Sequence, residues 1–200
     1  MKPMQYIVSD NDFAVKIENT YTDLNDSEKG TLPFVVFSSG KKILPIQNSY
    51  VDFFKQWTND YVYIKKRDLL QYSMPTNEFY SKEGNLEYTY DAIGENNYDP
   101  ELFEGVSREC GVGTDNSSSI KFNLLKFDFE KKQIIWIISY EQMQNKIGIE
   151  IGAKDHLMIS LDSKLSDEIW MYKIKIKYDD LTKNDATYNL KVNIKKGELM

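Results

Sequence analysis

An alternation of apolar and polar residues through the second half of the chain constrains its fold more than any other feature. From residue 120 onward, apolar side chains recur at every second position in short runs separated by polar residues. The runs are Ile120 to Phe129, Ile134 to Ile138, Ile147 to Ile151, Leu157 to Leu161, Trp170 to Tyr178 and Tyr188 to Ile194. A period of two is typical of strands with one buried face. We therefore predict a mainly β fold, either a β-sandwich or a meander-type antiparallel sheet, with one or two short helices.

Two of these runs predict local detail. Apolar residues occupy even positions up to Leu124 and odd positions from Leu125. This change of parity predicts a bulge near Leu124, because an extra residue moves the following side chains to the other face. The run from Ile134 to Ile138 is apolar on both faces, which predicts a central strand.

The first half of the chain is less regular. Short apolar runs at Phe13 to Ile17, Phe34 to Phe37 and Tyr61 to Ile64 predict strands. A helix is predicted where Tyr50, Phe53, Phe54, Trp57 and Tyr61 follow helical spacing, with a capping-box start at Ser49 and Asp52. A shorter helix is predicted to open at Asp99-Pro100-Glu101 and to end at Gly105 or Gly111. An α+β fold with a mixed N-terminal lobe is the alternative.

The length and composition suit one globular domain. The chain has 200 residues, of which 41% are apolar and 28% charged. We predict a single domain over residues 1–200, with two lobes as the alternative: a mixed α+β region over 1–112 and an antiparallel β region over 119–200. The glycine- and serine-rich stretch 111–119 between them reads equally well as a linker or as a surface loop.

Cysteine and histidine are too scarce for several kinds of site. Cys110 and His156 are single, so an intrachain disulfide is impossible and the common zinc sites are disfavoured. Cys110 follows a predicted helix and His156 falls in a predicted turn, so we do not expect them to form a catalytic pair. We predict no catalytic residue, no metal and no cofactor, although thirty-one acidic residues leave a carboxylate pair of the glycosidase kind open.

No segment suits a membrane or a signal peptide. The N-terminus lacks a long apolar stretch, and the run Ile134 to Ile138 is far shorter than the roughly 20 residues that a membrane-spanning helix needs. We therefore expect a cytoplasmic protein with no membrane partner, with leaderless export as part of an assembly as the alternative.

The net charge of −6 is unevenly distributed. Residues 1–74 hold nine acids and nine bases, and residues 119–200 hold twelve acids and fourteen bases. Residues 75–118 hold ten acids against Lys82 and Arg108 alone. This acidic segment is also rich in aromatic residues, which supply contact area at low entropic cost, while a field of one sign steers a partner of the other. We predict a partner-binding surface there, formed by Tyr80, Glu83, Glu87, Tyr88, Tyr90, Asp91, Glu95, Asp99, Glu101 and Glu104. The simpler interpretation is a solvated surface with the tyrosines packed against the sheet.

The last two predicted strands carry a basic face. A hairpin turning at Lys183, with Tyr178 opposite Tyr188, would gather Lys173, Lys175, Lys177, Lys191 and Lys195 on one side. This register sets Lys175 opposite Lys191, a like-charge pair that costs stability. The basic face is a secondary candidate for an anionic partner, and the alternative is a guard against edge-to-edge aggregation.

Three functions follow as hypotheses. The first is a non-enzymatic interaction module whose acidic, tyrosine-rich surface binds a basic protein, as an inhibitor, an immunity-type protein or a phage-encoded counter-defence protein would. The second is a structural subunit of a phage tail or contractile injection assembly. The third is a carbohydrate-active or carbohydrate-binding β-sandwich that uses exposed Tyr and Trp as sugar platforms, although Trp57, Trp136 and Trp170 lie on predicted core faces. Overall acidity with only two arginines disfavours a nucleic-acid partner. The oligomeric state stays open.

Overall fold

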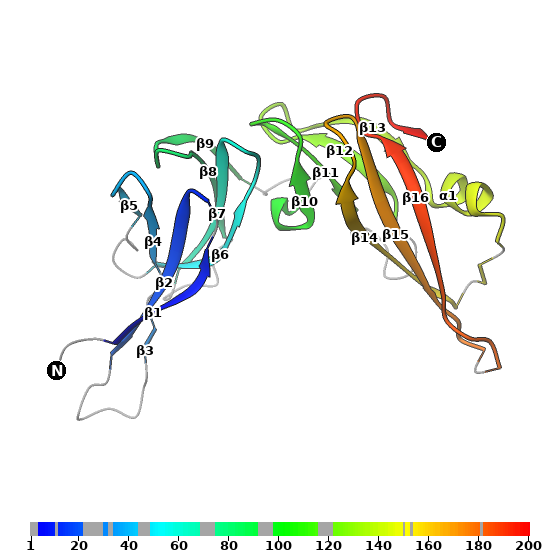
Figure 1. The fold of residues 1–200 in the computed structure, drawn as a ribbon, viewed down its shortest axis with the longest axis horizontal. Helices are drawn as coiled ribbons and strands as arrows, with labels where there is room; N and C mark the ends of the chain where they lie inside the picture. The colour runs from blue at the N-terminus through cyan, green and yellow to red at the C-terminus, as the bar shows by residue number, and fades with distance from the viewer. Residues whose placement is uncertain are drawn as a thin grey trace. The chain divides into compact units, whose positions relative to one another are not determined.

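The fold is mainly β and antiparallel, as the alternation predicts (Figure 1). The computed structural model describes residues 4–10, 12–21, 30–31, 34–43, 49–68, 75–91, 98–115, 122–149, 151–152, 154–180 and 182–200. The chain divides into two compact units, Met1–Glu101 (unit 1) and Leu102–Met200 (unit 2). Each unit contains two antiparallel sheets and a hydrophobic core of its own.

Unit 1 contains a five-stranded sheet and a four-stranded sheet. The first runs in the order β1-β2-β4-β5, with β3 also paired to β2: β1 (Met4–Asp10), β2 (Ala14–Tyr21), β3 (Gly30–Thr31), β4 (Phe34–Phe37) and β5 (Lys42–Ile43). The second is the meander β6 (Ser49–Gln56), β7 (Tyr61–Asp68), β8 (Thr76–Ser81) and β9 (Leu86–Tyr90). The strands predicted near residues 13–17, 34–37 and 61–64 are confirmed as β2, β4 and β7.

The core of unit 1 lies between its two sheets. Val35 and Phe37 of β4 pack with Val62 and Ile64 of β7 and Tyr80 of β8, and each is at most 4% exposed. Apolar side chains from two sheets that bury each other form a β-sandwich core.

The helix predicted over residues 50–61 is wrong, because that segment forms β6 and the start of β7. A bulge lies between Val51 and Phe53 in the pairing with β7. The extra residue changes the parity of the strand, so Val51 and Phe54 both face the core. The bulged strand therefore places core residues three positions apart, which is also the spacing of residues on one face of a helix.

The short helix predicted at Asp99 is a single 3-10 turn, η1 (Pro100–Leu102). The Asp99 carboxylate accepts a hydrogen bond from the Glu101 backbone N–H at 3.0 Å, as a capping residue does. The turn ends at neither Gly105 nor Gly111, because β10 begins directly at Phe103. Within its described residues, unit 1 contains no α-helix, so the alternative of a mixed α+β lobe is wrong for that part.

Unit 2 contains two four-stranded sheets and the α-helix of the described chain. The first sheet is β10 (Phe103–Gly105), β11 (Cys110–Thr114), β12 (Leu124–Asp128) and β13 (Gln133–Ile138), in that order. The helix is α1 (Tyr140–Ile147). The second sheet is β14 (His156–Lys164), β15 (Ile169–Lys177), β16 (Ala186–Asn193) and β17 (Glu198–Leu199). The strands predicted at residues 157–161, 170–178 and 188–194 are confirmed as β14, β15 and β16.

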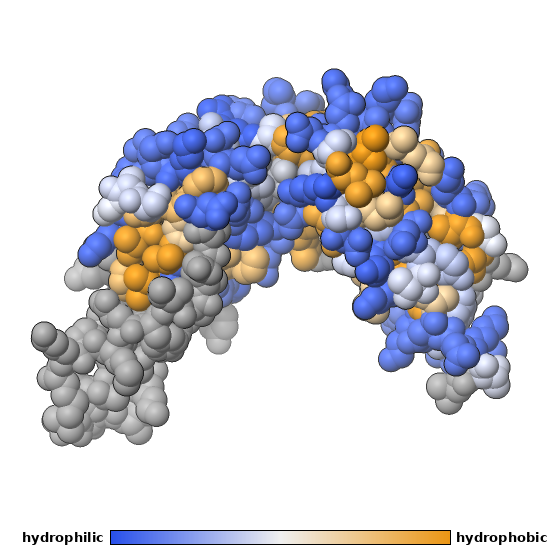
Figure 2. All heavy atoms as spheres, viewed as in Figure 1, coloured by the Kyte–Doolittle hydropathy of each residue, from blue (hydrophilic) through white to orange (hydrophobic). Residues whose placement is uncertain are grey.

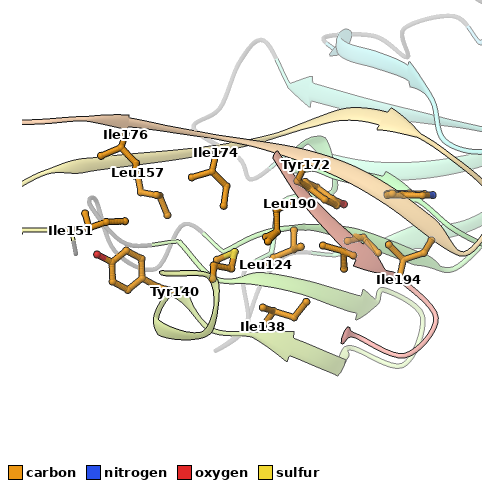
Figure 3. Close-up of a cluster of buried hydrophobic side chains, with 14 residues drawn as sticks. Leu124, Ile138, Tyr140, Ile151, Leu157, Tyr172, Ile174, Ile176, Leu190 and Ile194 are labelled. Atoms are coloured by element: carbon orange, nitrogen blue, oxygen red, sulfur yellow. The ribbon is translucent and has the colours of Figure 1, made fainter. Parts of the chain in front are cut away.

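The core of unit 2 lies between these sheets. Figure 3 shows Leu124 and Ile138 on one side and Leu157, Ile174 and Leu190 on the other, with their side chains directed toward one another. All five are at most 2% exposed. Unit 2 therefore has a core like that of a β-sandwich, as unit 1 does.

The glycine-rich stretch that begins at residue 111 is neither a linker nor a surface loop up to Thr114. Its first residues form β11, between β10 and β12 in the sheet. Gly113 has no room for a side chain, because a Cβ would collide with the Leu102 carbonyl and the Phe103 ring. Glycine serves here for close backbone approach. Residues 116–119 lie outside the described part of the chain.

The structure corrects two predictions about the sheet of β12 and β13. The bulge predicted near Leu124 lies in the neighbouring strand: the pairing of β12 with β11 has no register shift, but the pairing with β13 shifts between Lys126 and Phe127, where Ile135 of β13 is the extra residue. Leu124 and Leu125 are both 0% exposed, so β12 is the strand that is covered on both faces. The strand over residues 134–138 is not central: among the described residues β13 pairs with β12 alone and forms a sheet edge.

The strand predicted over residues 147–151 is also wrong, because α1 occupies residues up to Ile147. Ser139 caps this helix: its hydroxyl accepts from the Gln142 N–H at 3.2 Å, and Gln142 Oε1 accepts from the Ser139 N–H at 2.7 Å. Gly148, with φ +70°, ends the helix. The capping box Ser139-x-x-Gln142 was legible in the sequence, but alternating isoleucines at 147, 149 and 151 indicated a strand.

Candidate functional site

The β8–β9 hairpin of unit 1 holds the central part of the predicted acidic surface. Its turn is closed by the Gly84 N–H, which donates to the Ser81 carbonyl at 2.8 Å. Gly84 has φ +83°, and a Cβ there would meet the Phe37 ring at 2.9 Å, so this close approach requires glycine. Among the described residues β9 pairs with β8 alone and is an edge strand.

The tyrosines of the predicted surface are mostly packed into unit 1. Tyr80 is 4% exposed and Tyr90 is 2% exposed. Burial, followed by the charges of Asp99 and Asp91, raises the pKa of Tyr90 to about 12. Tyr88 is half-buried and stacks on Phe79 with ring centroids 4.4 Å apart. Of the three predicted tyrosines, Tyr88 is thus the one that reaches the surface.

Lys65 of β7 forms ion pairs with two of the predicted acids, so it balances one of their two negative charges. Its ammonium lies 2.6 Å from Asp99 Oδ2 and 2.9 Å from Glu101 Oε2. Lys65 is 6% exposed, and the Lys55 ammonium donates to the Glu101 carbonyl at 2.8 Å. The Tyr63 hydroxyl completes the cluster by donating to Asn77 Oδ1 at 2.8 Å. This cluster holds both carboxylates against unit 1, although each retains about a third of its side-chain exposure.

The pKa values of this cluster follow from burial and charge. Burial alone lowers the pKa of Lys65, but the hydrogen bonds and charges of Asp99 and Glu101 outweigh it, so the pKa is raised overall. Burial, reinforced by the charge of Asp99, raises the pKa of the Tyr63 hydroxyl. Lys65 is therefore held as a cation and Tyr63 as a neutral donor.

A second ion pair on β7 and β8 lies in part-buried surroundings. Lys66 and Glu78 approach to 2.5 Å, with side chains 13% and 12% exposed. The Tyr80 hydroxyl also donates to the Glu78 carboxylate. Burial, followed by this hydrogen bond, raises the pKa of Tyr80. Sequence reasoning did not identify Lys65 and Lys66 as partners of these acids; their signal was a run of three consecutive cations, Lys65 to Arg67, within a strand-forming segment.

Three of the predicted acids are displayed on unit 1. Glu83 lies in the β8–β9 turn, Glu87 lies on β9, and Asp91 follows β9; all three are exposed. Glu95 lies outside the described residues, and Glu104 belongs to unit 2. The ten predicted residues therefore do not form one continuous surface on unit 1.

The division of the chain sharpens the charge asymmetry. Unit 1 contains sixteen Asp and Glu against ten Lys and Arg, so it carries the whole net charge of −6. Unit 2 contains fifteen of each and is neutral. Figure 2 shows a surface on which hydrophilic residues predominate, with separate hydrophobic patches on the described parts of both units.

The predicted basic face exists on the outer side of β15 and β16, with a different register. Ile174 lies opposite Tyr188, and Lys191 lies opposite Met171, so the predicted pairing of Lys175 with Lys191 is wrong. The turn is centred nearer Asp180, whose carboxylate accepts from the Thr182 N–H at 2.9 Å. Compared with the prediction, each residue of β16 lies opposite a residue of β15 that is four positions earlier in the chain. Because a shift by an even number of residues does not turn a side chain to the other face, the lysines stay on one face, but Lys175 no longer lies opposite Lys191.

Acidic neighbours reduce the charge of this basic face. Lys173 pairs with Asp162 at 2.7 Å, and Lys195, which lies in the turn after β16, pairs with Glu168 at 3.1 Å. The side chains of Lys175, Lys177 and Lys191 are exposed. Lys175 also lines an open pocket of about 400 Å³ beside β14, together with Thr114, Phe122, Met158, Ile159 and Ser160. One cation in that lining gives it little preference for a particular ligand.

The surroundings of Cys110 and His156 bear on nucleophilic catalysis. Cys110 is half-buried on β11, and burial raises the pKa of its thiol, so the thiolate needed for nucleophilic attack is disfavoured. His156 begins β14, opposite Lys177, and is exposed. Across the described part of the chain, no three His, Cys, Asp or Glu side chains are grouped to hold a metal ion. No helix in that part is both long and apolar enough to span a bilayer.

The tryptophans do not form a sugar platform. Trp57 and Trp170 are 1% and 3% exposed. Trp136 is half-buried, and its indole N–H donates to the Ile194 carbonyl at 3.0 Å. Flat, exposed aromatic rings, which the carbohydrate-binding hypothesis requires, are not provided by these residues.

Comparison with known proteins gives no identification. No family model, no curated protein and no solved structure matches this chain.

Proposed function

We propose that this protein is a non-enzymatic interaction module that binds a basic partner protein through the exposed acidic side of the β8–β9 hairpin. The observation that carries the proposal is that unit 1 holds the entire net charge of −6 while Glu83, Glu87 and Asp91 are exposed along one hairpin. A one-signed field raises the association rate with an oppositely charged protein.

The same hairpin has features that suit a contact with another protein. Leu86 on the edge strand β9 is 52% exposed, and Tyr88 is half-buried and held by its stacking on Phe79. A rigid aromatic ring flanked by an apolar side chain is typical of the centre of a binding surface, and charges at its rim add specificity. Tyr80 and Tyr90 contribute by packing the hairpin into unit 1, and Asp99 and Glu101 contribute by pairing with Lys65 of β7, rather than by touching the partner.

Basic partners that an acidic module would block include proteins that act on nucleic acids, because their working surfaces carry clustered Lys and Arg. The proposed roles are therefore an inhibitor, an immunity-type protein that neutralises such a toxin, or a phage-encoded counter-defence protein.

The test is charge reversal on the hairpin. The partner is first identified by co-purification from the native host, and its affinity is then measured by calorimetry at several salt concentrations. We expect the triple variant Glu83→Lys, Glu87→Lys, Asp91→Lys to weaken binding by about 10² or more, because each exposed charge near an interface contributes on the order of 1 kcal/mol. Wild-type affinity is expected to fall as salt rises.

A matched control separates this surface from net charge in general. Glu130, Asp167 and Asp185 are exposed acids of unit 2, and reversing all three changes the total charge by the same amount. We expect this control to bind nearly as the wild type does. The proposal would be contradicted if both variants weakened binding equally. It would also be contradicted if neither salt nor the charge reversal on the hairpin changed the affinity for the partner.

A further inference from the structure

The pocket beside β14 lies where the two sheets of unit 2 come together at one side. Its described lining takes Thr114 from the end of β11 and Phe122 from just before β12, and the other four residues from β14 and β15. Among the described residues β14 is the last strand of its sheet, so the pocket lies at the open side of the sandwich. Its volume of about 400 Å³ is in the range that holds a small organic molecule.

Half of this lining is apolar, and a cation lies beside it. The apolar side chains are Phe122, Met158 and Ile159, of which Ile159 also packs against the core of unit 2. Met158 is 52% exposed and lies directly opposite Lys175 in the pairing of β14 with β15. Methionine is unbranched and polarisable, so it adapts to the shape of an apolar ligand. The pocket therefore offers apolar contact area next to one positive charge.

The polar groups of the lining are left for a ligand. Within the described part of the chain, neither the Lys175 ammonium nor the hydroxyls of Thr114 and Ser160 form a hydrogen bond or an ion pair. The charge of the neighbouring Lys173 is balanced instead by Asp162 at 2.7 Å. An ammonium and two hydroxyls are donors, and an anionic oxygen is the acceptor that suits them best.

Hydrogen bonds fix the β11–β12 side of the pocket. Asp115, which follows Thr114, is 4% exposed, and its carboxylate accepts from the backbone N–H of Asn123 at 2.9 Å and from its Nδ2 at 2.8 Å. Asn123 Oδ1 in turn accepts from the Tyr140 N–H at 3.0 Å, which ties this side to α1. Thr114 and Phe122 directly flank this network in the chain. The pocket is therefore formed in advance, which reduces the entropy lost on binding.

We propose that this pocket binds a small organic anion with an apolar aromatic or aliphatic body and one carboxylate or sulfonate group. The body packs against Phe122, Met158 and Ile159, and the anionic group accepts from Lys175. A single ammonium does not distinguish between anionic head groups, so the lining selects a class of ligand rather than one compound. The same charge rejects a cationic molecule of similar size. The pocket uses no residue of the β8–β9 hairpin, so this site is additional to the proposed partner surface.

Two fluorescent probes test the inference on the full chain: anilinonaphthalene sulfonate and phenylnaphthylamine. They share one ring system, and only the first carries a sulfonate. We expect the wild type to bind one equivalent of the sulfonate probe at least about tenfold more tightly than the neutral probe, because the sulfonate alone pairs with Lys175. Decanoate should displace the sulfonate probe, whereas decyltrimethylammonium should not.

Variants of the pocket locate the binding. Lys175→Met is expected to weaken binding of the sulfonate probe by about tenfold and to leave the neutral probe unchanged, because methionine keeps an apolar stem and removes the charge. The matched control, Lys177→Met, removes the same charge two residues further along β15 but outside the described lining, and should bind both probes as the wild type does. Ser160→Trp, which fills the pocket, should weaken both probes.

Several results would overturn the proposal. They are no binding of the sulfonate probe, equal affinity of the wild type for the two probes, or unchanged binding by a folded Ser160→Trp variant. Equal weakening by Lys175→Met and Lys177→Met would show a general attraction to the basic face and would also overturn it. If Ser160→Trp fails to fold by circular dichroism, the two lysine variants still decide the matter, because both lysines are exposed.

Discussion

Lys65 decides how much of the acidic charge of unit 1 is displayed. It is 6% exposed and lies within 2.9 Å of both Asp99 and Glu101, each of which retains about a third of its side-chain exposure. An ammonium at this depth is tolerated because two carboxylates and their hydrogen bonds replace its hydration. Glu83, in the hairpin turn, lies outside this cluster and is exposed.

Lys65→Met should therefore destabilise unit 1. We expect a loss of about 1–2 kcal/mol in the free energy of unfolding at neutral pH, less than for a fully buried pair, because water still reaches both carboxylates. Urea denaturation measures this loss. The control Lys82→Met breaks the exposed pair with Asp60 and is expected to cost less than about 0.5 kcal/mol.

The pH dependence of this difference has a definite sign. Because the folded pKa of Lys65 is raised above 10.5, its contribution is fully present below pH 10.5 and is lost as the pH rises through the folded pKa. The stability difference between wild type and Lys65→Met should thus be constant at neutral pH and shrink in strong alkali. A difference that instead shrinks on acidification from pH 8 to 6 would contradict this assignment.

At the scale of elements, turns and caps determine how strands and helix meet. The turn between β16 and β17 passes so close to Trp136 that a Cβ on Gly197 would lie 2.6 Å from the indole ring. Gly148, which ends α1, has a similar left-handed φ, +70° against +74°, but nothing lies within 4 Å of its would-be Cβ. Both glycines thus need a left-handed backbone conformation, but only Gly197 lacks room for a Cβ atom.

These glycines form a matched pair for substitution. Gly148→Ala should cost about 1 kcal/mol, which is the penalty for a left-handed residue with a Cβ. Gly197→Ala should cost about 1–3 kcal/mol more, because the indole of Trp136 must also move. Urea denaturation followed by tryptophan fluorescence measures both. Equal losses for the two variants would show that the turn and the ring adjust without cost.

Over the whole molecule, each unit has its own core. Ile64 in unit 1 and Ile174 in unit 2 are both 0% exposed and belong to separate apolar clusters. Truncation of a buried isoleucine costs about 2–5 kcal/mol, mostly through lost packing and the cavity that remains. This loss of stability should first affect the backbone amides that the same apolar cluster protects from hydrogen exchange.

Hydrogen exchange measured by mass spectrometry should therefore separate the two cores. Ile174→Ala is expected to speed exchange in β14, β15 and β16 and to leave β6, β7 and β8 nearly unchanged. Ile64→Ala is expected to do the reverse. If either variant accelerated exchange equally in both units, the two cores would unfold as one cooperative body.

The sequence by itself determined the β character of the chain and the faces of its most regular strands. β14, β15 and β16 follow strict alternation, because each has one buried face and one solvated face. The excess of acidic residues in 75–118 and the mainly β fold class could also be predicted from the sequence. These properties depend on residue type and local period, which a single chain displays directly.

Only the tertiary structure decided which acids are displayed, which strands form edges and where the chain divides. The bulge beside Val51 made a strand resemble a helix, and exposed isoleucines made the edge strand β13 resemble a buried one. Lys65 and Asp99 meet across 34 residues, a pairing that no local pattern encodes. Strand order, bulges and ion pairs depend on which distant segments pack together, and that is settled by the free energy of the whole fold rather than by local sequence.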